Sequence, residues 1–510
     1  MATSERAGVP TVSAEQSLWL EEEPGASWPA LERDQRVDVV VVGGGITGVT
    51  TALLLKRGGA SVALLEAARV ASGVTGCTTA KVSALQSTVY SAIAGRHGAE
   101  GAAAYADASR AGVERVAALA AEEGIECDLQ RRPAFTYAAA DNDLKSIERE
   151  ADAARAAGLD VVMTDEVELP YRVAGAARLD DQLEFHPVRY ARGLAAAVDG
   201  DGSIVAEQTR ALAVQEGSPC RVRTPGATIT AEHVVIASHY PLLDRGVFFA
   251  RLESQRSYCI AARARGPLPQ AMSISAGEVT RSIRSYGDLL IVGGEGHITG
   301  ASKATAERYE TLERFARAHW DVEAVTHRWS AQDPVPYDHL PMIGRYTPRS
   351  SRLYVASGFM KWGLSGGTMA AILLNDLIAG RANRWAAHFN PNRLSVRSAP
   401  KLAQLNAKVG LELIGDRLRP AQANSPADVP TGQARVVRDR LGKTGVYRDP
   451  DGTLHAVSLR CTHLGCLLRF NTAERSWDCP CHGSRFDADG TVLEGPATKA
   501  LERRHPIDRE

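Results

Sequence analysis

The stretch from residue 37 to residue 66 constrains the fold of this chain more than any other. It begins with VDVVVVGG, a short apolar and β-branched run of the kind found in buried parallel strands. ITGVTTALLLKRGG follows, with apolar residues at helical spacing and two final glycines that favour the end of a helix. A second apolar run, SVALLEA, completes the pattern, which predicts a β-α-β unit.

Three glycines, Gly43-x-Gly45-x-x-Gly48, open the predicted helix. Glycine lets the backbone turn sharply and approach a pyrophosphate, which the N-terminus of the helix stabilises. Glu66 ends the second strand 21 residues after Gly45, where a carboxylate accepts hydrogen bonds from a ribose diol. The alternative is a glycine-rich turn without a ligand. We predict a dinucleotide site formed by Gly43, Gly45, Ile46, Thr47, Gly48 and Glu66.

Length and charge set broad limits on the rest of the chain. At 510 residues it is too long for one hydrophobic core, so we expect two or three domains. The net charge of −1 gives no general attraction for nucleic acid or anionic lipid. No stretch approaches the roughly 20 apolar residues of a membrane span, and the N-terminus lacks the pattern of a secretory signal. We expect a cytoplasmic protein with no nucleic-acid partner and no membrane span.

Half of the eight cysteines lie in two short boxes near the C-terminus. The boxes read CTHLGC, residues 461–466, and CPCHGS, residues 479–484, and each contains one histidine. Because thiols are mostly reduced in the cytoplasm, clustered cysteines favour a metal site over structural disulfides. A Cys/His zinc site and an iron–sulfur cluster are both compatible with these residue types.

The longer, N-terminal part of the chain resembles the D-amino-acid oxidase and sarcosine oxidase superfamily of FAD-dependent amine oxidoreductases. The resemblance covers roughly residues 36–395 and rests on several separated motifs: ARVASGVTGCTTAKV (68–82), FHP (185–187), HVVIASHYP (233–241), YDHLPMIGR (337–345) and LYVASGFMKWGLSGGTMAAILLNDLI (353–378). It implies FAD as the cofactor. The chain has no second GxGxxG unit, so NAD(P)H is not expected as the reductant.

The resemblance also implies which residues surround the flavin, although it implies no specific catalytic residue. Near the flavin or its pyrophosphate it puts Ser72, Thr75, Thr78 and Thr79. Along the flavin it puts Gly358, Lys361, Trp362, Gly363, Leu364 and Ser365, among which Lys361 and Trp362 are the flavin-lining candidates for a role in catalysis. Cys77 occupies the position at which some relatives bind FAD covalently through a histidine, so a covalent link and an ordinary buried cysteine are both open.

The two cysteine boxes resemble the Rieske [2Fe–2S] signature C-x-H…C-x-x-H. The resemblance implies that Cys461 and Cys479 hold one iron, that His463 and His482 hold the other, and that Cys466 and Cys481 form a disulfide. It puts Ser484 beside a bridging sulfide, Phe486 where quinol-oxidising relatives carry a tyrosine, and Pro496 in a loop that covers the cluster. Histidine ligation raises the potential of such centres to about −150 to +300 mV, against about −400 mV for all-cysteine clusters. Electrons are therefore expected to flow from flavin to cluster.

These patterns together predict the architecture. We expect an α/β FAD-binding Rossmann-like domain with an inserted antiparallel-sheet substrate domain (α+β), followed by a C-terminal all-β Rieske domain. The predicted boundaries are an extension at 1–36, an oxidoreductase at 37–395, a helix and linker at 396–432, and the Rieske domain at 433–510. Within the oxidoreductase, the FAD-binding parts are about 37–97, 183–242 and 330–395, and the substrate parts are about 98–182 and 243–329.

The function implied by both resemblances is an FAD-dependent dehydrogenase. It would oxidise an amine or amino acid at a CH–NH bond by hydride transfer to the flavin, and would relay the electrons singly through the cluster to an external electron carrier. Three alternatives stay open. One is an oxygen-reducing amine oxidase whose cluster is structural or regulatory. The second is a redox-sensing or electron-transfer module without an organic substrate of its own. In the third, electrons flow in the opposite direction, from a carrier through the cluster to the flavin.

Several further residues and one helix carry weaker signals. Arg281 and Arg284 lie on a predicted strand of the substrate domain, where they could bind a carboxylate or form a solvated face. Tyr258 and Tyr286 are candidate pocket walls, His186 is expected to shape a turn before a helix, and His239 follows a predicted FAD-binding strand. The alanine- and glutamate-rich helix at 98–126 is expected to be a surface scaffold.

Overall fold

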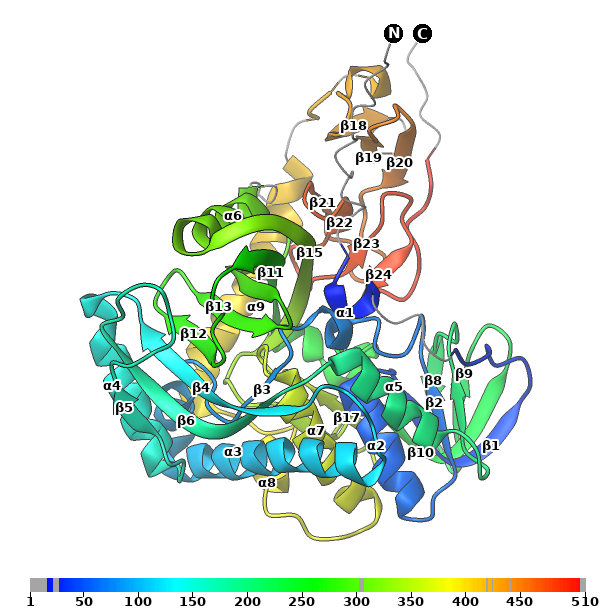
Figure 1. Cartoon of the computed structure of the whole chain (residues 1–510). Helices are drawn as coiled ribbons and strands as arrows, with labels where there is room; N and C mark the ends of the chain where they lie inside the picture. Colours follow the sequence, from blue (N-terminus) through cyan, green and yellow to red (C-terminus); the bar gives the residue numbers. More distant parts are fainter. Residues whose placement is uncertain are drawn as a thin grey trace, which may run out of the picture.

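The protein is described by a computed structural model, which covers residues 16–21, 27–301, 307–418, 421–423, 425–439 and 442–504. Three layers follow one another in space: a sheet backed by helices, a second larger sheet, and a small β domain at the top of Figure 1. Parts of the predicted extension (1–36) and linker (396–432) lie outside the described residues.

The first sheet contains the predicted β-α-β unit. Its main path is β16 (Met342–Arg345), β17 (Leu353–Ser357), β10 (Thr228–Ile236), β1 (Gln35–Val42), β2 (Val62–Leu65) and β7 (Ile204–Ala206), and β8 (Ala213–Gln215) and β9 (Cys220–Arg223) extend it beside β10. The pairs from β17 through β7 are parallel, whereas β16 and β9 pair antiparallel. The carboxyl ends of β1 and β2 therefore meet at one edge, the position at which α/β sheets bind ligands.

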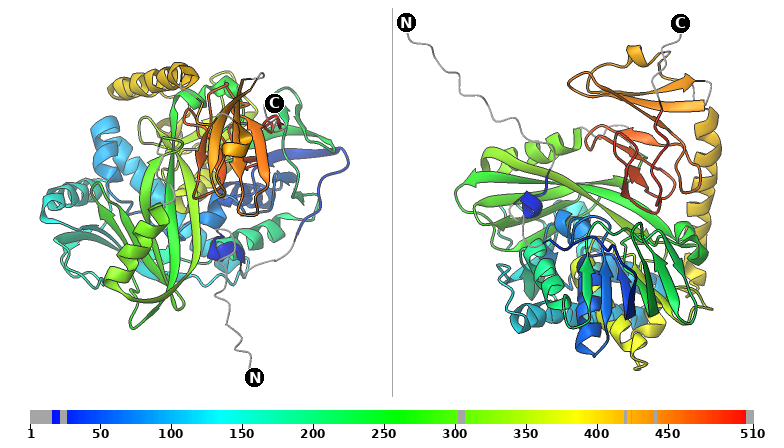
Figure 2. Two further views of the ribbon diagram at one scale, coloured as in Figure 1. Left: turned by 90° about the horizontal axis from the view of Figure 1, so that it is seen from above. Right: turned by 90° about the vertical axis from the view of Figure 1, so that its right-hand side faces the viewer.

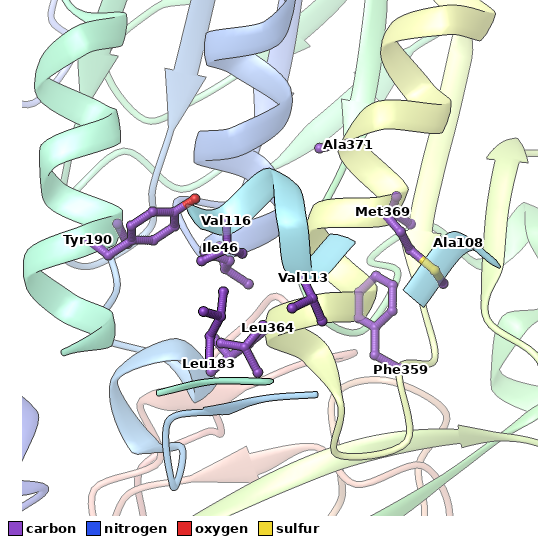
Figure 3. Close-up of a cluster of buried hydrophobic side chains, with 14 of the residues drawn as sticks. Ile46, Ala108, Val113, Val116, Leu183, Tyr190, Phe359, Leu364, Met369 and Ala371 are labelled. Carbon is purple, nitrogen blue, oxygen red and sulfur yellow. The ribbon is translucent and has the colours of Figure 1, made fainter. Parts of the chain in front are cut away.

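Helices pack against this sheet to form the largest core. They are α2 (Ile46–Arg57), α3 (Val89–Glu122), α5 (Pro187–Val198) and α7 (Gly363–Ile378), and α7 contacts both α2 and α3. Figure 3 shows side chains from all four helices meeting in one cluster, among them Ile46, Val113, Tyr190 and Leu364. The start of α2 and the start of α7 are thereby held side by side, directly below the edge at which β1 ends.

The expectation of a surface role for the helix at 98–126 is wrong. α3 extends from Val89 to Glu122 across a break at Gly98, which has φ +74° and ψ −176°, and the part after the break buries Tyr105, Val113 and Val116 among other residues. Small residues allow this close approach: a Cβ at Gly112 would lie 2.4 Å from the carbonyl oxygen of Ser365 in α7. The alanine-rich composition thus reflects tight helix–helix packing.

The second sheet has nine strands and is mainly antiparallel. Its order is β15 (Asp321–Pro336), β11 (Leu252–Arg265), β14 (Leu289–Ile298), β13 (Arg281–Tyr286), β12 (Met272–Ala276), β4 (Gln130–Ala138), β6 (Gly175–Glu184) and β3 (Lys81–Val82), with β5 (Val162–Thr164) beside β6. Only the pair of β12 and β4 is parallel within these described strands. The helices α4 (Asp141–Ala156) and α6 (Glu307–His319) pack on it.

Residues beyond 430 form the small β domain. Its two sheets are β18 (Ala434–Asp439), β19 (Gly442–Arg448) and β20 (Leu454–Ser458), then β21 (Arg469–Asn471), β22 (Ser476–Asp478), β23 (Arg485–Phe486) and β24 (Val492–Glu494). Figure 2 shows this domain above the second sheet, with α9 (Ala399–Leu418) running along one side of the molecule. The short α8 (Ala386–Phe389) precedes α9.

The N-terminal segment is anchored through a buried tryptophan. Trp19 of α1 (Leu18–Glu21) is fully buried, and its Nε1 donates a hydrogen bond to the carbonyl oxygen of Thr78, at 2.7 Å. His186 accepts a hydrogen bond from the backbone N–H of Arg189 and caps α5, so it does shape the start of a helix.

None of the helices in the described part of the chain combines the length and apolarity needed to span a membrane.

Candidate functional site

The glycine-rich turn after β1 has the geometry of a phosphate cradle. Gly43 has φ +113°, and a Cβ there would lie 2.4 Å from the carbonyl oxygen of Ala237. A Cβ at Gly48 would lie 1.8 Å from the carbonyl oxygen of Gly43, so only glycine lets α2 start this close to the strand. The Glu66 carboxylate accepts a hydrogen bond from the backbone N–H of Gly44 at 2.7 Å. This carboxylate therefore lies at the N-terminus of α2.

A cavity of about 890 Å³ opens from this turn and runs between the two sheets. Thirteen of the predicted FAD-binding residues line it: Gly43, Gly45, Ile46, Thr47, Glu66, Ser72, Thr75, Thr78, Thr79, Lys361, Trp362, Gly363 and Leu364. The structure thus brings together segments that are almost 300 residues apart in the chain. A cavity of this size, with a glycine turn at one end, fits FAD.

Three predicted residues, Gly48, Gly358 and Ser365, do not line the cavity but shape its walls. Gly48 allows the close contact of α2 with the turn described above. A Cβ at Gly358, which has φ +81°, would lie 2.5 Å from Cγ of Pro336. The Ser365 hydroxyl donates to the carbonyl oxygen of Ser83 at 3.1 Å and so ties α7 to the end of β3. In the structure these three residues hold the segments that line the cavity in place.

Cys77 also lines the cavity. Its backbone carbonyl accepts a hydrogen bond from Nε1 of Trp329 at 3.1 Å. Burial, followed by the Glu494 carboxylate, raises the pKa of its thiol to about 12. The thiolate needed for covalent attachment is therefore disfavoured in this environment.

Several charged residues that were not among the predicted site residues also line the cavity: Lys81, Glu278, Glu295, Arg308, Asp333 and Glu494. Burial and then the nearby Arg284 guanidinium lower the pKa of Lys81 to about 7. Its Nζ donates to the carbonyl oxygen of Ser273 at 3.0 Å. Lys81, Glu295 and Asp333 lie on strands of the second sheet, Glu278 lies in the turn between β12 and β13, Arg308 lies on α6, and Glu494 belongs to the small β domain. Only their common cavity relates them.

Lys361 occupies an unusual position at the start of α7. It has φ +75°, and the preceding Met360 has φ +53°, a conformation that is costly for residues with a side chain. Nζ of Lys361 lies 3.2 Å from the position a Cβ would take at Gly296 and makes no hydrogen bond or ion pair with the described residues. Burial lowers its pKa, and the Asp333 carboxylate opposes this effect. Lys361 therefore presents an amine to the cavity.

The weaker candidates separate clearly in the structure. Arg281 lines the cavity and is paired with Glu295 at 2.8 Å. Arg284 is buried and donates to the carbonyl oxygen of Ala80 at 2.9 Å, so it supports the wall instead of facing the cavity. Tyr258 and Tyr286 are not among the residues that line this cavity. Both tyrosines lie on the same sheet but pack against other side chains, Tyr258 against Tyr309 and Tyr286 against Trp19.

The two cysteine boxes fold into adjacent loops. Cys466 and Cys481 form a disulfide that ties the loops together. A hydrogen bond from the Cys479 thiol holds the pKa of Cys461 below its ordinary value, at about 7, so these two sulfur atoms are in contact. Ser484 is fully buried, and its hydroxyl accepts a hydrogen bond from the backbone N–H of Ala497 at 3.0 Å. Phe486 is also fully buried.

The two histidines of the boxes present unused ring nitrogens. Nδ1 of His463 and Nδ1 of His482 are buried and lack a hydrogen-bond partner in the described structure. The rings are 5.0 Å apart between centroids. A buried nitrogen without a partner is costly unless a ligand satisfies it. Two thiols in contact and two free imidazole nitrogens match the donor set of a Rieske cluster, so the residues present fit such a group.

The part of the protein that precedes the small β domain, called the body below, contacts the loops of the two cysteine boxes, called the cluster loops below. Nε2 of His463 lies 2.8 Å from the Asp244 carboxylate, and the Phe249 ring packs against the rings of both His463 and His482. Ser254 at the start of β11 donates to the carbonyl oxygen of His482 at 3.0 Å. The small β domain is therefore docked through its loops and not only through its linker.

A buried ion-pair network surrounds this contact. Arg256 on β11 is 1% exposed and pairs with Glu474 at 2.8 Å and with Glu494 at 3.7 Å, both in the small β domain. Arg485 lies 3.6 Å from the same Glu474 carboxylate and 3.0 Å from Glu494. Arg256 thus brings a buried positive charge from the body to two carboxylates of the other domain.

The segment 493–498 of the small β domain faces two ways. It lines the cavity with Leu493, Glu494, Gly495, Pro496, Ala497 and Thr498. Through the bond between Ala497 and Ser484 it also covers the second cysteine box. One short segment therefore contacts both the cavity and the loop of the second cysteine box.

Comparison with known proteins agrees with both halves of the site. Residues 38–377 match the family model described as FAD dependent oxidoreductase (DAO), and residues 421–504 match that of the Rieske [2Fe-2S] domain. A Bacillus subtilis protein described as a Rieske 2Fe-2S iron-sulfur protein, YhfW, is 33% identical over 497 residues, which are 96% of this chain and 97% of that protein. The iron-sulfur subunit 1 of the cytochrome b6-f complex of Nostoc is 49% identical over 53 residues, 10% of this chain and 30% of the subunit.

Solved structures share the fold of the longer part. Glycine oxidase from Geobacillus kaustophilus superposes with a TM-score of 0.60 at 22% identity and covers 71% of this chain and 99% of its own. L-proline dehydrogenase from P. horikoshii gives a TM-score of 0.58 at 18% identity, with 71% and 98% covered. L-amino acid deaminase from Proteus vulgaris gives 0.60 at 14% identity, with 73% and 100% covered.

Proposed function

Because the chain belongs to the FAD-dependent oxidoreductase (DAO) family and ends in a Rieske [2Fe–2S] domain, we propose that it is an amine or amino-acid dehydrogenase. In this proposal it oxidises a CH–NH bond and passes the electrons singly to an external carrier. Its cofactors are FAD and a Rieske-type [2Fe–2S] cluster.

The observation that carries the proposal is the shared cavity. The residues proposed to bind FAD, Gly43 and Lys361 among them, line the same space as the segment 493–498 that covers the cluster loops. A cluster kept only for structural support would not require the segment that covers its loops to line the cavity as well. This arrangement favours a relay over an oxidase whose cluster takes no part in turnover.

When bound, FAD accepts a hydride and the cluster accepts single electrons. The residues proposed to hold the cluster are Cys461, His463, Cys479 and His482, and the buried Nδ1 atoms of the histidines support this assignment. The turn at Gly43–Gly48 and the carboxylate of Glu66 are proposed to hold the pyrophosphate and ribose of FAD.

The remaining residues of the cavity orient the substrate and limit its contact with water. Lys361 presents its amine to the cavity, and its lowered pKa suits a group that holds or accepts a proton at Nζ. Arg281 and Glu295 neutralise one another at 2.8 Å, so their pair offers a polar wall of little net charge. An oxidisable amine must enter uncharged, which an environment of this kind favours.

The printed names of the structural neighbours, glycine oxidase, L-proline dehydrogenase and L-amino acid deaminase, support small amines and amino acids as the substrate class. The test is an anaerobic screen of primary, secondary and N-methylated amines and amino acids on the holoprotein. We expect at least one of them to bleach the flavin absorbance and then to produce the EPR signal of a reduced Rieske cluster. Bleaching without any EPR signal would contradict the relay, and the absence of bleaching by every compound would contradict the dehydrogenase.

A further inference from the structure

Gln332, a residue of β15, connects the cavity with the second cluster loop. It lines the cavity and is 2% exposed. Its side-chain Nε2 donates a hydrogen bond to the carbonyl oxygen of Gly483 at 2.8 Å. Gly483 directly follows His482, which is proposed to hold an iron. One side chain therefore touches both the cavity and the peptide next to a cluster ligand.

The orientation of Gln332 is fixed at three points. The carboxamide oxygen accepts a hydrogen bond from the Thr299 hydroxyl at 2.7 Å, which determines which end of the amide faces Gly483. The backbone carbonyl of Gln332 lies 2.6 Å from Nε2 of His239, which therefore carries the proton. His239 follows β10, at the edge of the first sheet where FAD is proposed to bind, and it too lines the cavity.

The loop accepts this contact because glycine leaves room for it. Gly483 has φ +79°, and a Cβ there would lie 2.9 Å from Nε2 of Gln332 and 2.3 Å from the Ser254 hydroxyl. Two side chains of the body, those of Gln332 and Ser254, therefore contact this loop, but they border different cavities. Gln332 borders the cavity, whereas Ser254 borders a separate small pocket beside α9.

We propose that Gln332, held by His239 and Thr299, is the positioning residue for electron transfer from the flavin site to the cluster. The inference rests on the proposed function. Each transfer removes one electron from reduced FAD and converts one ferric iron of the cluster to ferrous iron, with no bond made or broken in the protein. The two electrons of one substrate molecule need two such transfers, which return FADH⁻ to FAD with release of one proton to solvent, and an external one-electron carrier reoxidises the cluster between them.

The hydrogen bond matters because electronic coupling is stronger through a bonded path than across a gap between atoms. The path runs from the cavity through the Gln332 side chain to the Gly483 carbonyl and then along one peptide unit to His482. Ser254 contacts the same loop through the carbonyl of His482 but reaches no cavity atom. A change at Ser254 therefore tests docking of the loop, and a change at Gln332 tests docking and the path together.

The experiment compares Gln332→Met with Ser254→Ala in the full-length holoprotein. Methionine keeps the length and volume of the side chain but removes the donor to Gly483. A laser flash with 5-deazariboflavin reduces one centre, and the absorbance of flavin and cluster then reports internal equilibration without any amine. We expect equilibration to slow several-fold in Gln332→Met and to stay close to the wild-type rate in Ser254→Ala.

Two further measurements separate positioning from a structural role. The midpoint potential and the EPR g values of the cluster are expected to be the same in all three proteins, since neither variant touches a ligand side chain. Equal rates in wild type and Gln332→Met would overturn the proposal, as would equal slowing in both variants or a shifted potential that accounts for the slower rate. If the wild-type protein itself shows no internal transfer with both cofactors bound, the relay in the proposed function fails instead.

Discussion

The cluster loops and the cavity beside them are assembled in different ways. The proposed cluster residues all come from positions 461–484, two boxes that the disulfide between Cys466 and Cys481 joins. The cavity takes its lining from nearly the whole chain, from Val42 to Thr498. A local site depends on a few donor atoms, whereas a distributed site depends on how whole domains pack. Single substitutions should therefore act differently in the two regions.

The largest expected effect comes from removing one donor of the local site. Cys479→Ser replaces a thiolate by a hydroxyl, which is a poor ligand for iron in such clusters. We expect complete loss of the Rieske EPR signal and of bound iron and sulfide, with FAD still bound in the purified protein. A matched change at the buried, distant Cys220→Ser should leave the cluster signal intact. Retention of a full cluster in Cys479→Ser would contradict the ligand assignment.

The next effect concerns the packing on which the distributed site depends. Arg256→Ala leaves the Glu474 carboxylate buried without its closest cationic partner. Breaking a buried ion pair in this way costs about 3–5 kcal/mol, which chemical denaturation monitored by tryptophan fluorescence can measure. The control is Arg263→Ala on the same strand, because the exposed pair of Arg263 with Asp288 is worth only about 0–1 kcal/mol. Similar losses in both variants would show that the contact between the domains is weak.

A smaller effect is expected at the glycine turn. Gly43→Ala puts a side chain at φ +113°, a backbone conformation that costs of the order of 1–3 kcal/mol, and also 2.4 Å from the carbonyl oxygen of Ala237. We expect the purified protein to lose most of its FAD, as measured by the ratio of flavin to protein absorbance. Gly59→Ala has a similar φ of +92° but nothing within 4 Å, so it should lose stability without losing FAD. Equal FAD contents would contradict the close approach of the turn to the cofactor.

The smallest expected effect is a loss of folding stability at acid pH, which depends on the ionisation of Glu474. Although burial opposes ionisation, Arg256 and Arg485 lower the pKa of Glu474 from 4.5 to about 2. Since the pKa is lower in the folded protein, the stabilisation is complete above about pH 4.5 and is lost as the pH falls toward 2. The stability advantage of wild type over Glu474→Gln, measured by denaturation at several pH values, should shrink in that window. A constant difference from pH 7 to pH 3 would argue against an ionised Glu474.

The contrast between the two regions also explains what the sequence could predict. The turn at Gly43, the acid at Glu66 and the two cysteine boxes have fixed spacings along the chain, because local backbone geometry sets them. Glu295 and Glu494 have no such spacing, since they meet only after the second sheet and the small β domain pack. The position of Gln332 was missed for the same reason: its contacts to His239 and Gly483 span 93 and 151 residues.

Composition misled the interpretation in one region. The alanine-rich helix around Gly112 suggested a surface scaffold, whereas α3 is buried against α7. Small residues at Ala106, Ala108 and Gly112 alternate with Val113 and Val116 on the buried face. That spacing was visible in the sequence and is the signal that could have predicted close packing with another helix.

We propose that the flavin and the cluster exchange electrons within one chain. Freeze-quench EPR after anaerobic mixing with a reducing substrate, repeated over a range of protein concentrations, distinguishes this transfer from transfer between molecules. We expect the Rieske signal to rise with a rate constant independent of protein concentration, because one segment of the small β domain contacts both the cavity and the cluster loops. A rate constant that increases in proportion to protein concentration would mean that electrons pass between molecules, and would contradict this proposal.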